Sequence, residues 1–189
     1  TWYAHASVGC LHVRPILNMK NSNDVFAMRK IAEEAFELVR QYKGSHSGEH
    51  GDGISRSEFS EKMFGHKMVS LFQLIKHEFD PQNLFNPGKI TNAPKMDDRS
   101  LFRYAPGYHV DDFPTKLNWK NWPGSAGGLQ GAVEMCNNNG ACRKLQGGVM
   151  CPSFRATRNE RDSTRGRANS LRLALSGQLG PKALASDEM

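Results

Sequence analysis

The chain has 189 residues, of which 38% are hydrophobic and 23% charged, and its 25 Lys and Arg against 19 Asp and Glu give a formal net charge of +6. This length suits one domain, or one domain with a small additional module. The composition excludes a coiled coil, a collagen and a wholly disordered chain, and no apolar run approaches the ~20 residues that cross a bilayer. The basic excess suits an anionic partner, whether phosphate, a carboxylate substrate or nucleic acid.

Four cysteines are too few to build a disulfide scaffold in a chain of this length. Three lie within sixteen residues, beside glycine and proline, a pattern that favours metal ligation in a reducing compartment. Because the start has no signal-peptide pattern, we expect a cytoplasmic protein, with peripheral attachment to the inner membrane as the alternative. The chain opens at Thr1 without an initiator methionine, so we expect a piece of a longer polypeptide.

Two short strands are predicted at the start of the chain, on either side of Gly9. If the second strand begins at Cys10, the alternation of side chains places Cys10, His12 and Arg14 on one face. A long amphipathic helix is then predicted from Asn21 to about Lys43. Its expected apolar stripe consists of Val25, Met28, Ala32, Ala35, Leu38, Val39 and Tyr42.

A glycine-rich loop over residues 44–53 separates this helix from a second helical region, which is predicted over Ser57 to His77 with Gly65 as a breaking point. The apolar face of the second region comprises Met68, Leu71, Phe72 and Ile75. Residues 92–128 contain recurring prolines and little periodicity, so we expect an extended linker. A short helix over 129–135, the cysteine segment and a basic helix ending at Leu175 follow.

The predicted fold class is therefore α+β. Antiparallel strands with packed helices are expected over residues 1–91, and a small helical module over 129–189 after the linker.

His5 and His12 are seven residues apart across a predicted turn, so both imidazoles can reach one site. With a carboxylate such as Glu49 they would form a three-ligand site for Zn, Fe, Mn or Co with an open position for a substrate oxygen. His50 would be free for proton transfer, because neighbouring side chains on an extended segment point in different directions. The alternatives are histidines with only hydrogen-bonding roles and a glycine loop that is a flexible connector.

Three motifs follow one another over about ninety residues. They are His-Ala-Ser-Val-Gly-Cys-Leu-His-Val-Arg-Pro from His5, Ser-Gly-Glu-His-Gly-Asp-Gly from Ser47, and Phe-Asp-Pro-Gln-Asn-Leu-Phe-Asn-Pro-Gly-Lys from Phe79. Together they resemble the C-terminal part of the FAD-linked oxidases of the vanillyl-alcohol-oxidase superfamily, the group of FAD-dependent D-lactate dehydrogenases, glycolate oxidase and D-2-hydroxyglutarate dehydrogenase. The resemblance implies that residues 1–91 are the C-terminal substrate or cap part of such an oxidase.

In the metal-dependent members of this family, the matching residues hold a divalent metal (Zn, Mn or Fe) and act on the substrate hydroxyl. The resemblance thus implies metal ligation by His5, His12 and Glu49, and a catalytic role for His50.

Two further residues are candidates for binding the substrate and the flavin. The guanidinium of Arg14 can pair bidentately with the carboxylate of a 2-hydroxy acid, although an Arg before proline can equally make a structural ion pair. The resemblance places Asn86 near the flavin ring, whereas a turn that stops a helix explains the neighbouring Pro87 and Gly88 without a flavin. No glycine-rich nucleotide-binding unit occurs in the sequence. In the family that the chain resembles, an N-terminal domain holds the phosphate and adenine parts of FAD, so the resemblance implies an N-terminal FAD domain of the same polypeptide and poor FAD binding by this chain alone.

The cysteine segment partly matches the bacterial ferredoxin motif Cys-x2-Cys-x2-Cys-x3-Cys-Pro. Cys136 and Cys142 match its first and third cysteines, Cys151 with the following proline matches its last, and Asn139 replaces the second. The Thr-Arg-Gly-Arg-Ala from Thr164 resembles the iron–sulfur region fused behind the oxidase domain in large bacterial members of the family. We expect an incomplete 4Fe-4S site, with Cys136 and Cys142 sharing one cluster, Cys151 serving another, and a second cysteine motif elsewhere in the polypeptide. A structural zinc site and idle thiols are the alternatives.

The basic run from Arg143 to Arg172 contains almost no aromatic residues, so it lacks a stacking platform and we expect no nucleic-acid partner. The sequence thus predicts a fragment of a flavin-dependent dehydrogenase of D-lactate or a similar 2-hydroxy acid. It would pass hydride to FAD and electrons through iron–sulfur clusters to a membrane-associated or soluble acceptor. The alternative is a non-catalytic module for metal binding or electron transfer, whose first half is only scaffold.

Overall fold

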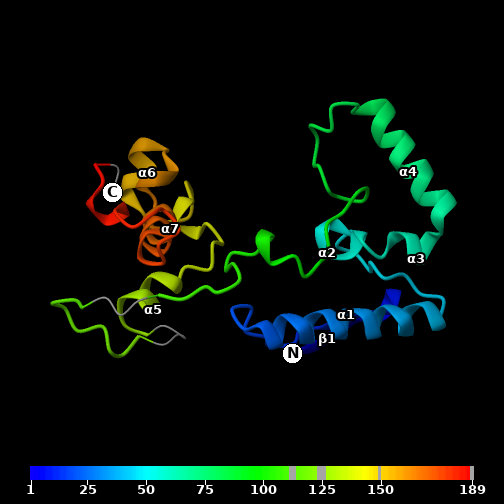
Figure 1. The fold of residues 1–189 in the computed structure, drawn as a ribbon, viewed down its shortest axis with the longest axis horizontal. Coiled ribbons are helices and arrows are strands. Elements are labelled where there is room, and N and C mark those ends of the chain that lie inside the picture. The colour runs from blue at the N-terminus through cyan, green and yellow to red at the C-terminus, as the bar shows by residue number, and fades with distance from the viewer. Residues whose placement is uncertain (111–113, 123–126, 149, 188–189) are drawn as a thin grey trace. The chain divides into compact units, whose positions relative to one another are not determined.

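The computed structural model describes residues 1–110, 114–122, 127–148 and 150–187, and the chain divides into two compact units, Thr1–Pro106 and Gly107–Met189 (Figure 1). The described part is rich in helix and contains a small antiparallel sheet, as expected for an α+β protein. The boundary between the units lies inside the predicted linker. Among the described residues, no helix combines the length and the apolar character that crossing a membrane requires.

The chain begins with a β-hairpin, which confirms the two predicted strands. Strands β1 (Trp2–His5) and β2 (Cys10–Val13) are antiparallel and are joined by the 3-10 helix η1 (Ala6–Val8). Gly9 closes this turn with a φ of 63°, which glycine adopts without strain. In β2, the side chains of Cys10 and His12 are half-buried while the two that alternate with them are exposed, so the predicted face is also correct.

Helix α1 (Ser22–Gln41) confirms the predicted long helix, and the side chain of Asn21 accepts a hydrogen bond from the backbone N–H of Asn23 at its start. The predicted apolar stripe is partly wrong. Tyr42 is 81% exposed, whereas Phe36, which the stripe did not include, is only 1% exposed. Phe36 is buried because its ring packs 5.0 Å from the ring of Phe59, which comes from a distant part of the sequence.

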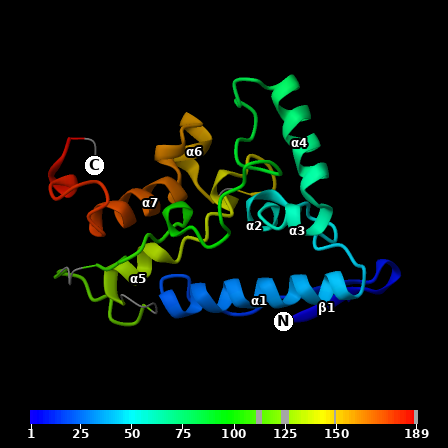
Figure 2. The same ribbon diagram turned by 45° about the vertical axis from the view of Figure 1, so that its right-hand side comes forward.

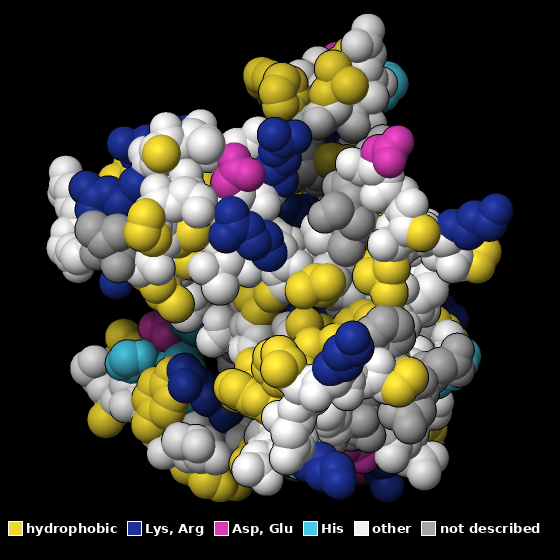
Figure 3. Space-filling model, turned by 90° about the vertical axis from the view of Figure 1, so that its left-hand side faces the viewer, with side chains coloured by type: hydrophobic (Ala, Val, Ile, Leu, Met, Phe, Trp, Pro, Cys, Tyr) yellow, Lys and Arg dark blue, Asp and Glu magenta, His cyan; other side chains and the backbone are white. Residues whose placement is uncertain are grey.

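Three helices follow the glycine-rich loop: α2 (Gly53–Ser57), α3 (Ser60–Phe64) and α4 (His66–Phe79). Gly65, with a φ of 81°, separates α3 from α4 and confirms the predicted break. Helices α3 and α4 pack through the rings of Phe64 and Phe72, which lie 5.9 Å apart. None of the residues of α4 is buried, and exposed apolar side chains are also visible on the face of the molecule drawn in Figure 3.

The turn after α4 is built around the buried carboxylate of Asp80. This carboxylate accepts the backbone N–H groups of Leu84 and Phe85, both at 2.9 Å, and pairs with the ammonium of Lys76. The hydrogen bond from Lys76, opposed by burial and supported by the two backbone donors, lowers the pKa of Asp80 to about 2. Asp80 therefore holds residues 84 and 85, which directly precede the Asn-Pro-Gly-Lys turn at residues 86–89.

The second unit contains the helices α5 (Gly128–Glu134), α6 (Pro152–Thr157) and α7 (Thr164–Leu175). Helices α5 and α7 pack against each other, as the views of Figures 1 and 2 both show. Helices α5 and α7 confirm the predictions, whereas α6 was not predicted, although the proline at its first position is a common start signal. The short 3-10 helices of the chain are η2 (Arg99–Leu101), η3 (Ala141–Arg143), η4 (Glu160–Asp162) and η5 (Ala183–Ala185).

Gly166, in the first turn of α7, allows this helix to approach η4 closely. A Cβ at position 166 would lie 2.2 Å from the carbonyl oxygen of Glu160 and 3.2 Å from the Cα of Arg161. Both are backbone atoms, so a larger side chain can be accommodated only if η4 and α7 move apart.

We expect Asp80→Asn to lower the Tm most at pH values above about 4. A carboxyl whose folded pKa is depressed contributes stability that is complete above its unfolded pKa and is lost as the pH falls through its folded pKa. The difference from the wild type should therefore shrink between about pH 4 and pH 2. Thermal unfolding over this range measures it, with Glu78→Gln, an exposed acid on α4, as the control. A difference that is independent of pH would show that the charge of Asp80 does not stabilise the turn.

We expect Gly166→Ala to destabilise the second unit by about 1–3 kcal/mol, the usual cost of forcing extra atoms into a packed site. Chemical denaturation followed by circular dichroism measures this cost. Gly44→Ala is the matched control, because a Cβ there would meet its nearest atom at 3.4 Å and the residue does not have a positive φ. Equal stability of the two variants would contradict the close contact between α7 and η4.

Candidate metal centre and cysteine segment

The β-hairpin and the glycine-rich loop bring two imidazoles and one carboxylate together. The Oε1 of Glu49 lies 2.9 Å from the Nε2 of His12 and 3.4 Å from the Nε2 of His5. One ligand atom from each of these three residues lies within 4.8 Å of the others. The antiparallel register causes the convergence of the two histidines, because it pairs His5 with Cys10 and so places His12 two residues further along the same face.

His46 anchors the glycine-rich loop to the core of the first unit. Its ring meets the rings of Phe36 and Phe59 edge-on, at centroid distances of 5.0 and 5.1 Å. Burial, helped by the positive charge of Arg56 and opposed by Asp52, lowers the pKa of His46. The neutral ring therefore serves as an apolar anchor for the loop.

Gly48 lets the loop come close to strand β2. A Cβ at this position would lie 2.7 Å from the Sγ of Cys10. Its absence allows the backbone of the next residue, Glu49, to pass beside the hairpin. The loop is thus held at His46 and closely packed at Gly48. A purely flexible connector would not need either contact.

His50 also contacts the carboxylate of Glu49. The Nε2 of His50 lies 2.9 Å from the Oε1 of Glu49, and the ring centroids of His50 and His12 are 5.6 Å apart. The expectation that the two neighbouring side chains diverge is therefore wrong, because residues 48–50 form bends rather than an extended segment. The side chain of His50 is 62% exposed, compared with 11% for His12.

The three histidines stabilise the ionised form of Glu49. Burial alone would raise the pKa of this carboxyl. The charges of His5, His12 and His50, together with the hydrogen bond from His50, outweigh this effect, and the pKa of Glu49 lies below its usual value. A carboxylate that stays ionised is the form that binds a cation.

The donor set fits a divalent metal. Two imidazole nitrogens and one carboxylate oxygen are typical ligands of Zn, Mn or Fe sites, and three protein ligands leave a position open for a further oxygen. The distances between the three donor atoms are of the size that a shared ion requires, and the partly exposed rim of His5, Glu49 and His50 gives access from solvent. Metal ligation by this group stays a prediction.

Arg14 contacts the group through Tyr3, a residue that lies outside the sequence motifs. Its guanidinium donates a hydrogen bond to the hydroxyl of Tyr3, and the ring of Tyr3 stacks on His12 with a centroid distance of 4.3 Å. The register of the hairpin about Gly9, which pairs Tyr3 with His12, is the signal that could have identified Tyr3.

Asn86 lies in a separate segment, the turn that follows α4, where it adopts a φ of 48°. Its Oδ1 accepts a hydrogen bond from the Nζ of Lys89 at 3.2 Å. This contact stabilises the turn itself, and the proximity of Asn86 to a flavin stays a prediction.

No disulfide joins Cys136, Cys142 or Cys151, the cysteines of the second unit. Cys142 and Cys151 are buried and Cys136 is half-buried. Among the described residues, the donor atoms of His5, His12 and Glu49 all lie within 4.8 Å of one another, whereas the three sulfur atoms of these cysteines do not. The side chain of Asn139, which replaces the second ferredoxin cysteine, accepts the backbone N–H of Ala141 and thereby closes the turn before Cys142.

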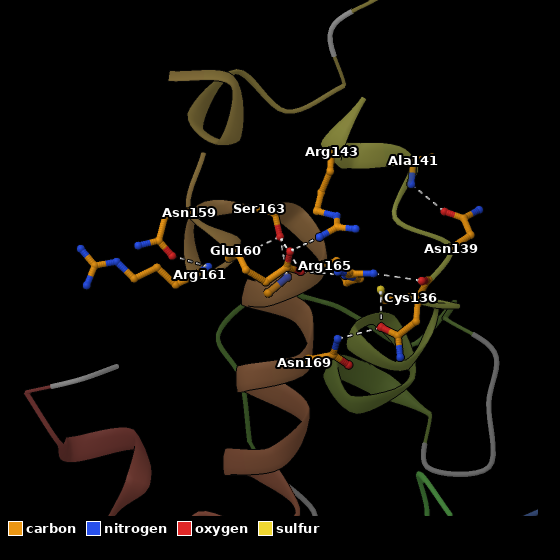
Figure 4. A network of polar contacts seen from close by, with 12 residues as sticks. Cys136, Asn139, Ala141, Arg143, Asn159, Glu160, Arg161, Ser163, Arg165 and Asn169 are labelled. Carbon is orange, nitrogen blue, oxygen red and sulfur yellow. Dashed lines mark hydrogen bonds and ion pairs between the residues drawn. The ribbon is translucent and has the colours of Figure 1, made fainter. Parts of the chain in front are cut away.

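Glu160 connects the cysteine segment with the start of α7 (Figure 4). Its carboxylate binds the guanidinium groups of Arg143 at 3.1 Å and Arg165 at 2.7 Å, and these contacts, that of Arg165 foremost, lower the pKa of Glu160. Arg165 also donates to the backbone oxygen of Asn138, two residues after Cys136. The basic residues near the cysteines are thus partly used in internal ion pairs.

Cys151 has a polar environment that favours its thiolate. The hydrogen bond from the backbone N–H of Phe154, with further bonds from Thr164 and the charge of Arg167, lowers the pKa of Cys151 despite its burial. A thiolate is the form of cysteine that ligates metals. Ligation of a cluster by any of the cysteines stays a prediction.

Known proteins resemble this chain over part or most of its length. Residues 1–90 match the family described as FAD linked oxidases, C-terminal domain. The chain is 34% identical over 176 residues to the D-2-hydroxyglutarate dehydrogenase of Escherichia coli (strain K12), a match that covers 90% of this chain and 16% of that protein. It is also 34% identical over 190 residues to the protein of the same name from Pseudomonas putida, covering 97% of this chain and 18% of the relative.

A shorter match covers about half of the chain. The D-lactate dehydrogenase of Archaeoglobus fulgidus is 34% identical over 88 residues, which are 47% of this chain and 19% of that protein. No solved structure matches. The chain spans less than one fifth of the length of these curated relatives. The matched family and the relatives together show that residues 1–90 are similar to the C-terminal domain of FAD-linked oxidases.

Proposed function

We propose that this chain is part of a flavin-dependent dehydrogenase that oxidises a 2-hydroxy acid, such as D-lactate or a similar compound. The convergence of His5, His12 and Glu49 beside His50 is the observation that carries the proposal. The names of the relatives, which include D-2-hydroxyglutarate and D-lactate dehydrogenases, support this class of substrate.

His5, His12 and Glu49 would hold a divalent metal, Zn, Mn or Fe. When bound, such an ion polarises an oxygen of the substrate. The ionised carboxylate of Glu49 and the short distances to both imidazoles support these three residues as its ligands.

The residues around this group would bind and orient the substrate. His50 accepts the hydroxyl proton, a role that suits an exposed imidazole at the rim of the site. Arg14 binds the substrate carboxylate through its exposed guanidinium. Loss of the hydroxyl proton leaves an electron pair on oxygen that forms the C=O bond as the α-hydrogen departs as hydride, and pairing of the carboxylate with Arg14 orients the substrate for this transfer.

FAD would accept this α-hydrogen as hydride. Its phosphate and adenine parts would bind an N-terminal FAD domain of the same polypeptide, and Asn86 would approach the flavin ring. The family description of residues 1–90 and the greater length of the relatives support this division of the site.

Electrons would leave through iron–sulfur clusters of the 4Fe-4S type. Cys136 and Cys142 would serve one cluster and Cys151 another, with the missing ligands supplied by a second cysteine motif of the polypeptide. The environment of Cys151, which favours its thiolate, supports this role, and the match to the Pseudomonas putida relative covers 97% of this chain. The final acceptor would be soluble or associated with the membrane, and the enzyme would be cytoplasmic or peripheral to the inner membrane.

We expect His50→Ala and Glu49→Ala to separate proton transfer from metal binding in the complete enzyme. Loss of a positioned base typically costs ~10²–10⁴-fold in rate, so His50→Ala should lose kcat while it retains metal and FAD. Glu49→Ala removes a ligand, so the metal content and kcat should fall together. Metal analysis beside kcat for D-lactate and D-2-hydroxyglutarate checks both, with His66→Ala as a control at an exposed histidine on α4. Near-normal kcat in His50→Ala would show that another group takes the proton.

We expect the cysteine variants of the complete, anaerobically purified enzyme to fall into two classes. Cys136→Ser and Cys142→Ser should remove the same electron paramagnetic resonance signal, whereas Cys151→Ser should remove a different one. Iron and acid-labile sulfide should fall in all three and remain unchanged in Cys10→Ser, which alters the first unit. Zinc without sulfide would favour the structural-zinc alternative, and unchanged iron and sulfide in every variant would exclude these thiols as ligands.

A further inference from the structure

Tyr3 contacts both histidines of the candidate metal centre. Its ring is stacked on that of His12, with a centroid distance of 4.3 Å and an interplanar angle of 5°, and it meets the ring of His5 edge-on at 6.2 Å. The antiparallel pairing of Tyr3 with His12 places the two side chains opposite each other on the same face of the hairpin. Tyr3 therefore covers one face of the imidazole whose Nε2 points to Glu49.

The same tyrosine also contacts Arg14. The hydroxyl of Tyr3 accepts a hydrogen bond from the guanidinium, whose carbon lies 4.7 Å from the centroid of the ring. Backbone hydrogen bonds between Thr1 and Arg14 extend the ladder beyond the two strands and keep Arg14 near Tyr3. One side chain thus contacts a proposed metal ligand through its ring and the proposed carboxylate-binding cation through its hydroxyl.

We propose that Tyr3 is a positioning residue that orients His12 toward the metal and Arg14 toward the substrate carboxylate. This inference rests on the proposed function. The torsion that turns an imidazole ring has broad minima, and metal-binding histidines depend on contacts beyond the metal to fix their orientation. The stacked ring of Tyr3 restricts this rotation of His12.

The hydroxyl of Tyr3 has a separate effect on Arg14. An arginine side chain has many rotamers, and holding it in place before a ligand arrives reduces the entropy lost on binding. The two effects can be separated, because Tyr3→Phe retains the ring and removes the hydroxyl, whereas Tyr3→Leu removes both.

Titration of the full chain with Co²⁺, followed by its visible absorption, tests the contribution of the ring. A contact of the strength usual for aromatic pairs corresponds to about threefold to tenfold in affinity. Tyr3→Leu should weaken Co²⁺ binding by this factor, and Tyr3→Phe should bind as the wild type does. Tyr42→Leu, the same substitution at an exposed tyrosine outside the site, is the matched control. Tyr3→Val, with its high strand propensity, replaces Tyr3→Leu if circular dichroism shows that the leucine variant is unfolded.

Nuclear magnetic resonance of the metal-free chain tests the two contacts directly. The ring protons of His12 should be shifted by the ring current of the stacked aromatic in the wild type and in Tyr3→Phe, and this shift should be lost in Tyr3→Leu. The Nε of Arg14 should become more mobile in Tyr3→Phe, as measured by its heteronuclear nuclear Overhauser effect.

The possible outcomes separate this inference from the proposed function. A wild type that does not bind Co²⁺ would overturn the metal centre and the role of Tyr3 with it. Equal Co²⁺ affinity of the wild type and Tyr3→Leu would overturn the orientation of His12 by Tyr3 and leave the metal centre intact. Equal loss of Co²⁺ affinity in Tyr3→Leu and Tyr42→Leu would show a general effect on stability and would overturn the specific role of the Tyr3 ring. Unchanged mobility of Arg14 in Tyr3→Phe would overturn the role of the hydroxyl.

Discussion

The carboxylate of Glu49 is the point at which the β-hairpin and the glycine-rich loop meet. Its Oε1 lies within 3.4 Å of the Nε2 atoms of His5, His12 and His50. These contacts depend on a loop that is anchored by His46 in an aromatic core and that carries a glycine where it passes Cys10. The candidate site thus depends on two conditions: the position of the glycine-rich loop and the hydrogen-bonded register of the hairpin.

The second unit has an analogous centre of different character. Glu160 binds two arginines and lies beside the fully buried Ser163, whose hydroxyl donates to the backbone oxygen of Glu160 and accepts the N–H of Gly166. This network holds the cysteine segment against α7 through Arg165. The contacts of this network are internal. We therefore interpret the network as a scaffold that supports the cysteine segment, and we propose a ligand role only for the thiols.

Local sequence signals predicted most of the regular elements. Gly9 with alternating residues on either side predicted the hairpin, Asn21 and the apolar periodicity predicted α1, and Gly65 predicted the break before α4. These signals succeed because a turn, a cap or a left-handed residue depends on the chain within a few positions. The failures concern contacts between distant segments. Periodicity alone could not show that Phe36 would be buried by Phe59.

The candidate site shows the same division. The sequence by itself determined the chemical inventory: two histidines that a hairpin can place on one face, a Glu-His pair in a glycine loop, and three cysteines in a ferredoxin-like spacing. Only the tertiary structure decided that the loop returns to the hairpin, that His50 shares an oxygen of Glu49, and that Tyr3 lies between His12 and Arg14. The physical reason is that a motif specifies only which donor atoms are available. The distance between donors from separate segments is set by the packing of side chains that lie outside the motifs, such as that of His46 on Phe36 and Phe59.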